Sequence, residues 1–189
     1  GKKKYVGYEL PGRTLGVVGL GAIGVYVANA AIALGMRVIG FDPTITVKSA
    51  WKMSAEVQEM PSVDELIKQS DFVTFHVPLL DSTKNLLDEK RIASMKNGAV
   101  VLNFARDGIV DDEAVLKALD NGKLGAYVCD FPAQNLKGHS KVITLPHLGA
   151  STVEAEENCA IMVADQLKDF LENGNIHNSV NFPEIRLAR

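Results

Sequence analysis

Two groups of residues combine types and spacing that could do chemistry, and the first is a run of glycines. Gly19, Gly21 and Gly24 form the pattern GxGxxG. Such glycines suit a turn whose backbone approaches a pyrophosphate, which the N–H groups at the start of the following helix can bind. Asp42 follows Gly24 by 18 positions (42 − 24 = 18). An acid near that distance accepts hydrogen bonds from ribose hydroxyls and repels a 2′-phosphate, so the pattern predicts a dinucleotide site that prefers NAD to NADP.

The second group contains an arginine and a histidine in the later part of the chain. Arg106 suits bidentate capture of a carboxylate, and His147 could take or give a proton near neutral pH. Each has a simpler alternative, since a loop arginine usually faces solvent and a histidine after a proline is often a structural hydrogen-bonding residue. His76 is a weaker candidate for a base, because the nearby Pro78 suggests a loop packed on the nucleotide.

The segments that must position these residues alternate between strand and helix patterns. Alternation of this kind predicts an α/β fold, a Rossmann-type doubly wound parallel sheet with helices on both faces. The last helix is expected to begin with a capping box at Ser151 and to end at Gly174. The expected strands are 15–18, 37–41, 71–77, 98–103, 124–129 and 141–144, and the expected helices begin at Gly24 and span 47–52, 62–70, 88–95, 111–121 and 151–173.

In an open parallel sheet the ligand lies beyond the carboxyl ends of the strands. The candidate residues follow four of the expected strands, so we expect them to converge on one rim of the sheet. These residues are His76, Val77 and Pro78, then Phe104, Ala105 and Arg106, then Asp130, and finally His147.

Composition excludes several other classes of function. The formal net charge is −3 over 189 residues, which gives no support for nucleic-acid binding. Residues 15–36 carry no charge and are long enough for a membrane span, but their five glycines argue against one continuous helix. Cys129 and Cys159, in a chain without a signal-peptide pattern, predict reduced thiols in the cytoplasm. Neither has metal-ligand spacing, so we expect both to pack in a core and no metal to bind.

Five motifs, in their order and spacing, carry a family resemblance: GRTLGVVGLGAIG, FDP, HVPLLDSTKNLL, NFARDGIVD and PHLGAST. They resemble the NAD domain of the D-2-hydroxyacid dehydrogenases, and within that family they are most similar to members that oxidise 3-phospho-D-glycerate in serine biosynthesis. The resemblance implies an oxidoreductase that transfers a hydride from a 2-hydroxy acid to NAD. It implies that Arg106 binds the substrate carboxylate and that His147 removes the proton of the C2 hydroxyl.

The resemblance also implies a set of cofactor contacts and a homodimer formed through this domain. Asp130 would meet the carboxamide of the nicotinamide. The implied cofactor-binding residues are Gly19, Gly21, Ala22, Ile23, Gly24, Asp42, Val77, Pro78, Phe104, Ala105, Arg106, Asp130, His147, Gly149 and Ala150.

The chain departs from the family pattern in two respects. The family builds a substrate domain from residues ahead of the NAD domain together with the end of the chain. We therefore expect 1–189 to be a single dinucleotide-binding domain, with 1–11 and 176–189 as stubs toward an absent substrate domain.

The second departure concerns a catalytic side chain. The family places a Glu between the Arg and the His, to hydrogen-bond the imidazole. Alignment on Asp130 puts that position at Asn135, and alignment on Phe131 puts it at Gln134. An amide can orient an imidazole but cannot stabilise its charged form as an anion does. An NAD-sensing or dimerising module without turnover is therefore the alternative function.

Overall fold

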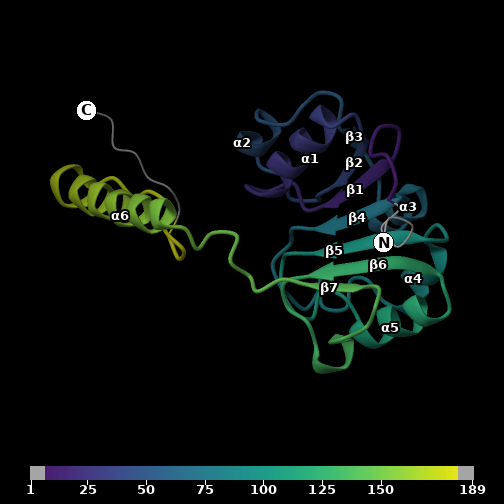
Figure 1. Ribbon diagram of the computed structural model, residues 1–189. Coiled ribbons are helices and arrows are strands. Elements are labelled where there is room, and N and C mark those ends of the chain that lie inside the picture. The colour runs from purple at the N-terminus through teal and green to yellow at the C-terminus, as the bar shows by residue number, and fades with distance from the viewer. Residues whose placement is uncertain (1–6, 183–189) are drawn as a thin grey trace. The chain divides into compact units, whose positions relative to one another are not determined.

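The computed structural model describes residues 7–182, and a seven-stranded sheet organises its first part (Figure 1). Parts of the two expected stubs, residues 1–6 and 183–189, lie outside the described residues. The strands are β1 (Thr14–Val18), β2 (Arg37–Phe41), β3 (Gln58–Glu59), β4 (Phe72–Phe75), β5 (Ala99–Asn103), β6 (Leu124–Cys129) and β7 (Val142–Thr144). The helices are α1 (Gly24–Ala33), α2 (Val47–Ala50), α3 (Val63–Gln69), α4 (Glu89–Ser94), α5 (Asp112–Asp120), the 3₁₀-helix η2 (Gln134–Leu136) and α6 (Val153–Asn173).

The strand order is β3-β2-β1-β4-β5-β6-β7, and each neighbouring pair is parallel. Strands β2 and β3 follow β1 on one side of it, whereas β4 and the later strands lie on its other side. Leu15 is accordingly paired with Val38 on one side and with Phe72 on the other. This order confirms the predicted Rossmann-type sheet, and the reversal between β1 and β4 is where such folds bind nucleotides.

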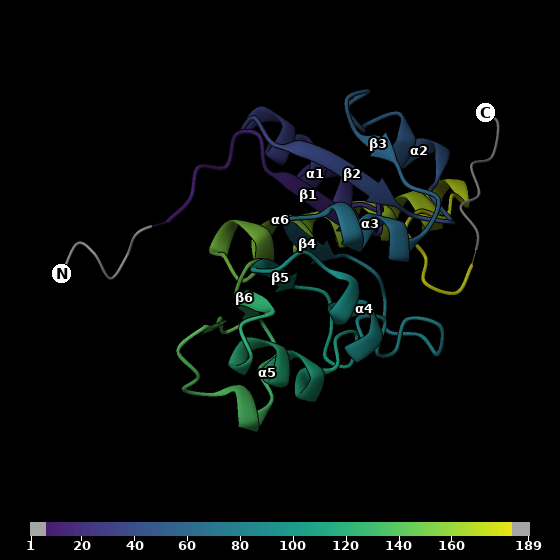
Figure 2. The ribbon, with the colours of Figure 1, turned by 90° about the vertical axis from the view of Figure 1, so that its right-hand side faces the viewer.

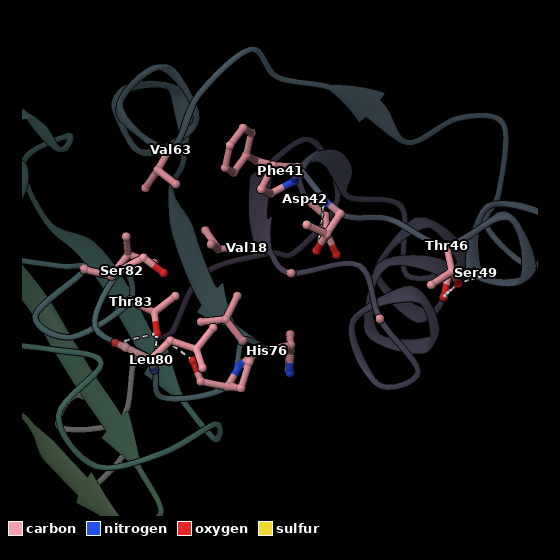
Figure 3. Close-up of a pocket in the computed structure, with 17 residues that line it drawn as sticks. Val18, Phe41, Asp42, Thr46, Ser49, Val63, His76, Leu80, Ser82 and Thr83 are labelled. Atoms are coloured by element: carbon pink, nitrogen blue, oxygen red, sulfur yellow. Dashed lines mark hydrogen bonds between the residues drawn. The ribbon is translucent and has the colours of Figure 1, made fainter. Parts of the chain in front are cut away.

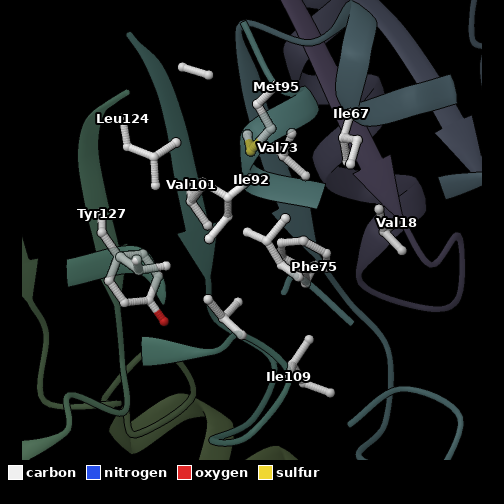
Figure 4. Packing of buried hydrophobic residues seen from close by; sticks show 14 of the residues in the cluster. Val18, Ile67, Val73, Phe75, Ile92, Met95, Val101, Ile109, Leu124 and Tyr127 are labelled. Carbon is white, nitrogen blue, oxygen red and sulfur yellow. The ribbon is translucent and has the colours of Figure 1, made fainter. Parts of the chain in front are cut away.

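Helices of the first part cover both faces of the sheet (Figure 2). On one face α1 buries Val25 and Ala28 against Val17 and Val38. On the other face α3, α4 and α5 pack over a larger cluster, part of which is drawn in Figure 4. Complete burial of a side chain such as Leu66 stabilises the fold by about 1.5–3 kcal/mol relative to an exposed position. Strands β1 and β2, which flank the glycine turn and Asp42, are therefore covered by α1 on one face and by α3 on the other.

Side-chain caps fix the starts of the helices that were expected from polar signals. Ser62 accepts a hydrogen bond from the Glu65 N–H (3.2 Å), and Asp88 accepts one from the Arg91 N–H (2.8 Å). The cap of α6 is Thr152, which accepts from the Ala155 N–H (3.1 Å), so the expected cap at Ser151 is wrong by one residue. Gly174 ends α6 with φ of 72°, as expected.

The chain divides into two compact units, Gly1–Pro146 and His147–Arg189. The described part of the second unit contains α6 and the turn that follows it. There Asp169 accepts hydrogen bonds from Asn173 (2.7 Å) and Asn175 (3.0 Å). Cys129 is buried as expected, but the expectation of a core position for Cys159 is wrong, because no residue of α6 is buried.

The uncharged run 15–36 is divided between β1 and α1. Within residues 7–182, no helix combines the length and the apolar character needed to cross a membrane.

Candidate dinucleotide site

The glycine turn after β1 has two positions where the surrounding backbone requires glycine. Gly19 has φ of +91°, and a Cβ there would lie 2.6 Å from the carbonyl oxygen of His76. A Cβ on Gly24 would overlap the carbonyl oxygen of Gly19. Gly21 differs, because a Cβ there would meet no atom within 4 Å. The open space at Gly21, beside the start of α1, fits a ligand that approaches the backbone closely.

Asp42, directly after β2, is tied to the glycine turn. Its Oδ2 accepts a hydrogen bond from the Leu20 N–H (2.8 Å), and its Oδ1 accepts one from the Thr44 N–H (2.8 Å). The Thr44 hydroxyl also donates to Oδ1 (3.1 Å). A carboxylate offers about four acceptor positions in all, so Asp42 retains capacity for a ribose hydroxyl. These bonds hold the negative charge of Asp42 next to the glycine turn.

A cavity of about 440 Å³ lies between the glycine turn and the loop after β4 (Figure 3). Its volume falls within the range of about 300–1,000 Å³ that is usual for small-molecule sites. The lining residues include predicted cofactor contacts and several that the sequence did not single out: Gly19, Gly21, Asp42, Thr44, Thr46, Ser49, His76, Val77, Pro78 and Thr83.

A second cavity, of about 570 Å³, shares His76, Val77 and Pro78 with the first. It continues to Ile23, at the start of α1, and to the loop Phe104, Ala105 and Arg106 after β5. Ala22 lines a third, smaller cavity together with Gly21 and Lys52. The two larger cavities form adjoining sites on either side of the loop after β4, which suits an elongated ligand whose middle passes the glycine turn.

His76 borders both large cavities and is mostly buried. Its Nε2 lies 3.0 Å from the Thr74 hydroxyl, and desolvation lowers its pKa to about 4. The imidazole is therefore neutral at pH 7, and it adds no positive charge beside the cavities.

This burial predicts a stability effect in acid. The unfolded histidine titrates near pH 6.5, so between pH 6.5 and pH 4 the unfolded state binds more protons than the folded state, and stability falls as pH falls. Lowering the pH from 7.5 to 4.5 should reduce the free energy of unfolding by about 2–3 kcal/mol through His76. Urea denaturation at both pH values should show His76→Gln losing less stability than the parent by about this amount. Equal losses would mean that His76 is not held neutral by burial.

The other candidate residues lie after β5, β6 and β7. The Arg106 guanidinium donates from Nη1 to the Ala105 carbonyl (2.7 Å). The backbone N–H of Asp130 donates to the Asn103 carbonyl (3.2 Å). Gln134 and Asn135 are exposed on η2, where Gln134 accepts from Lys137 Nζ (3.1 Å). His147, Gly149 and Ala150 open the second unit, where His147 has φ of 55°.

Comparison with known proteins decides the family. The family described as "D-isomer specific 2-hydroxyacid dehydrogenase, NAD binding domain" matches residues 1–149. The chain belongs to this family. It is therefore an NAD-binding domain, as the glycine turn and Asp42 predict.

The D-3-phosphoglycerate dehydrogenase of Methanocaldococcus jannaschii is 41% identical over 97% of this chain, which covers 36% of that protein. The Bacillus subtilis and human proteins of the same name are each 40% identical over 95% of the chain, which covers 35% and 34% of their lengths. The chain thus spans about a third of the length of these relatives.

Solved structures of the family share this fold. D-2-hydroxyisocaproate dehydrogenase aligns with a TM-score of 0.83 at 28% identity, covering 94% of this chain and 58% of that one. D-lactate dehydrogenase of Aquifex aeolicus, solved with NAD and lactic acid, aligns at 0.75 and 28% identity, covering 89% and 56%.

Sequence reasoning missed several hydroxyl residues of the first cavity. Thr44 holds Asp42, Thr46 caps α2, and Thr83 donates to the Pro78 carbonyl (2.6 Å). A threonine two residues after Asp42 is a recognisable signal, because an Asp side chain often accepts from the N–H two positions on. Thr83 carried no such local signal.

Proposed function

We propose that this domain provides the NAD site and the reacting residues of an enzyme that oxidises 2-hydroxy acids, and that its substrate is 3-phospho-D-glycerate. The observation that carries the proposal is the pair of adjoining cavities, which joins the glycine turn and Asp42 to the Arg106 loop. The substrate follows from the relatives named D-3-phosphoglycerate dehydrogenase, which match nearly the whole chain.

In this proposal NAD supplies the acceptor for the hydride that leaves C2 of the substrate. Gly21 lets the backbone approach the pyrophosphate, and Asp42 accepts from the ribose hydroxyls. Arg106 pairs with the substrate carboxylate, which aligns C2, and Asp130 meets the carboxamide of the nicotinamide. His147 takes the proton of the C2 hydroxyl. The remaining cofactor contacts are those implied by the family resemblance.

The test is reduction of NAD, followed by absorbance, by the protein as its gene encodes it. A panel should contain 3-phospho-D-glycerate, D-lactate and D-2-hydroxyisocaproate. We expect turnover that is fastest with the phosphorylated acid. NAD binding by calorimetry without turnover of any acid would instead support the NAD-sensing or dimerising module.

Asp42 should determine the choice of cofactor. Asp42→Asn keeps an acceptor for the Leu20 N–H but removes the charge, so it should weaken NAD binding by about 10- to 150-fold, the equivalent of a 1.5–3 kcal/mol charge-assisted bond. It should also bring the ratio of the NAD affinity to the NADP affinity closer to one. Calorimetry with both cofactors measures this, and Asp81→Asn, in an exposed loop, is the control. An unchanged ratio would remove Asp42 from the cofactor site.

We further propose that an amide of Gln134 or Asn135 orients His147 where relatives use Glu. A carboxylate raises the imidazole pKa, so Gln134→Glu and Asn135→Glu, made separately, should reveal the partner. Only the variant that faces His147 should raise the kinetic pKa of hydroxy-acid oxidation, by an amount equivalent to about 1 kcal/mol. A shift in neither variant would remove both amides from this role.

We also propose that the protein is a cytoplasmic homodimer. The family resemblance supports the dimer, and the two free cysteines suit a reducing compartment. Light scattering at micromolar concentration tests the dimer, and a monomer mass would contradict it.

A further inference from the structure

Asn103, the last residue of β5, is a buried polar residue that bonds to two segments of the candidate site. It is only 2% exposed. Its Oδ1 accepts from the Ala105 N–H (3.2 Å), and its Nδ2 donates to the Arg106 carbonyl (3.0 Å). Its own carbonyl accepts from the Asp130 N–H (3.2 Å). One residue therefore bonds the backbone on both sides of the Arg106 Cα and also the start of the Asp130 segment.

Tyr127 holds this amide from the opposite side. It projects from β6 into the same buried layer as Val101 (Figure 4), and its hydroxyl lies 3.5 Å from Asn103 Nδ2. Asp112, the first residue of α5, lies close enough for its charge to act on this hydroxyl.

The environment keeps the Tyr127 proton in place. Burial raises the pKa of Tyr127 far above its ordinary value, and the charge of Asp112 is the second-largest cause. Burial also raises the pKa of Asp112 to about 6, and there the charge of Asp107 is the second-largest cause. The hydrogen bonds thus run from Tyr127 on β6 through Asn103 to the Arg106 loop, and they use both amide protons of Asn103.

Arg106 needs such support because its side chain is exposed and, among residues 7–182, its guanidinium donates only to the neighbouring Ala105 carbonyl. The direction of its guanidinium therefore depends on the backbone of residues 105 and 106. Misplacement of a binding group by about 1 Å can cost two orders of magnitude in rate.

We propose that Asn103 is a positioning residue, held by Tyr127, that orients Arg106 toward the carboxylate of the substrate. The proposal rests on the role of Arg106 given under the proposed function. It adds a specific expectation: loss of the Asn103 amide should raise KM for the hydroxy acid by a larger factor than it weakens NAD binding.

The test compares Asn103→Ala and Asn103→Asp with Val101→Ala in the protein as its gene encodes it. Asp keeps the shape and the acceptor for Ala105 but cannot donate to the Arg106 carbonyl when ionised. Val101 lies two residues earlier on the same face of β5, and its side chain is fully buried and apolar, so its variant controls for lost core packing.

Both Asn103 variants should raise KM for 3-phospho-D-glycerate by at least about tenfold while the Kd for NAD changes less than about threefold. Amide exchange at Ala105 should accelerate in the same variants. Val101→Ala should lower Tm without either effect. If the rise in KM is proportional to the fall in Tm across all three variants, including Val101→Ala, then Asn103 has only a structural role and the proposal is wrong.

Two further variants keep the outcomes separate. If Asn103→Ala fails to fold, Tyr127→Phe, which removes only the hydroxyl, decides: a raised KM with unchanged NAD affinity supports the proposal, and an unchanged KM overturns it. Arg106→Ala reports on the proposed function itself. A normal KM in that variant would refute the role of Arg106, whereas a raised KM beside normal Asn103 variants would refute only the positioning role.

Discussion

Gly24→Ala should destabilise the domain severely, whereas Gly21→Ala should leave its stability intact and still weaken NAD binding. The Cβ of the first variant would overlap the Gly19 carbonyl oxygen, which belongs to backbone and cannot move aside as a flexible side chain can. We expect a loss of at least about 3 kcal/mol, at or above the usual cost of overpacking. The Cβ of the second variant meets no protein atom within 4 Å, so any penalty must come from the ligand.

Thermal unfolding and calorimetry on the same two preparations measure the contrast. Gly21→Ala should keep the parent Tm and lose at least about tenfold in NAD affinity, which corresponds to 1.4 kcal/mol. Gly122→Ala, at a turn with φ of +79° outside the cavities, shows how much an added Cβ costs in a strained turn alone. Normal NAD affinity in Gly21→Ala would mean that the pyrophosphate does not approach this backbone.

Arg106→Ala should lower kcat/KM for the hydroxy acid by about 10- to 150-fold or more, since a hydrogen bond to a charged group contributes about 1.5–3 kcal/mol. Arg106→Lys keeps the charge but not the planar pair of donors, so it should recover only part of the loss. Steady-state kinetics on the encoded protein measure both, and the unfolding temperature of each variant is the internal control. Full recovery of kcat/KM in Arg106→Lys would show that a positive charge alone is sufficient at this position. An unchanged kcat/KM in Arg106→Ala would exclude Arg106 from substrate binding.

The parts of the fold that sequence predicted best are those with a strong local pattern. β2 and β6 begin and end at the expected residues, because each is an apolar run between clear turn signals. β3 was missed because two residues cannot display a period, and it forms only through pairing with β2 at Ile39 and Gly40. Thr152 rather than Ser151 caps α6 because adjacent hydroxyl residues can both serve, and only the backbone geometry selects one.

In the site, too, features that depend on neighbouring residues in the sequence were predicted, whereas contacts between residues far apart in the sequence were not. The glycine pattern and the spacing to Asp42 are local and identified the cofactor. The bond from Leu20 to Asp42, the neutral state of His76 and the link from Asn103 to Tyr127 depend on residues that come together only in the folded sheet. Burial, which sets the His76 pKa, has no signature in a single sequence.

The central position of β1 also has a consequence for how the domain is made. β1 pairs with β2, 23 residues away at Leu15 and Val38, and with β4, 57 residues away at Leu15 and Phe72. Closing the longer loop costs more entropy, and such long-range parallel pairing is slow. During synthesis the glycine turn and Asp42 also leave the ribosome before His76 and Val77, because they come earlier in the chain. His76 and Val77 complete the first cavity. We expect NAD to bind only after β4 has joined the sheet, so that the cofactor stabilises the finished fold and does not guide its first half.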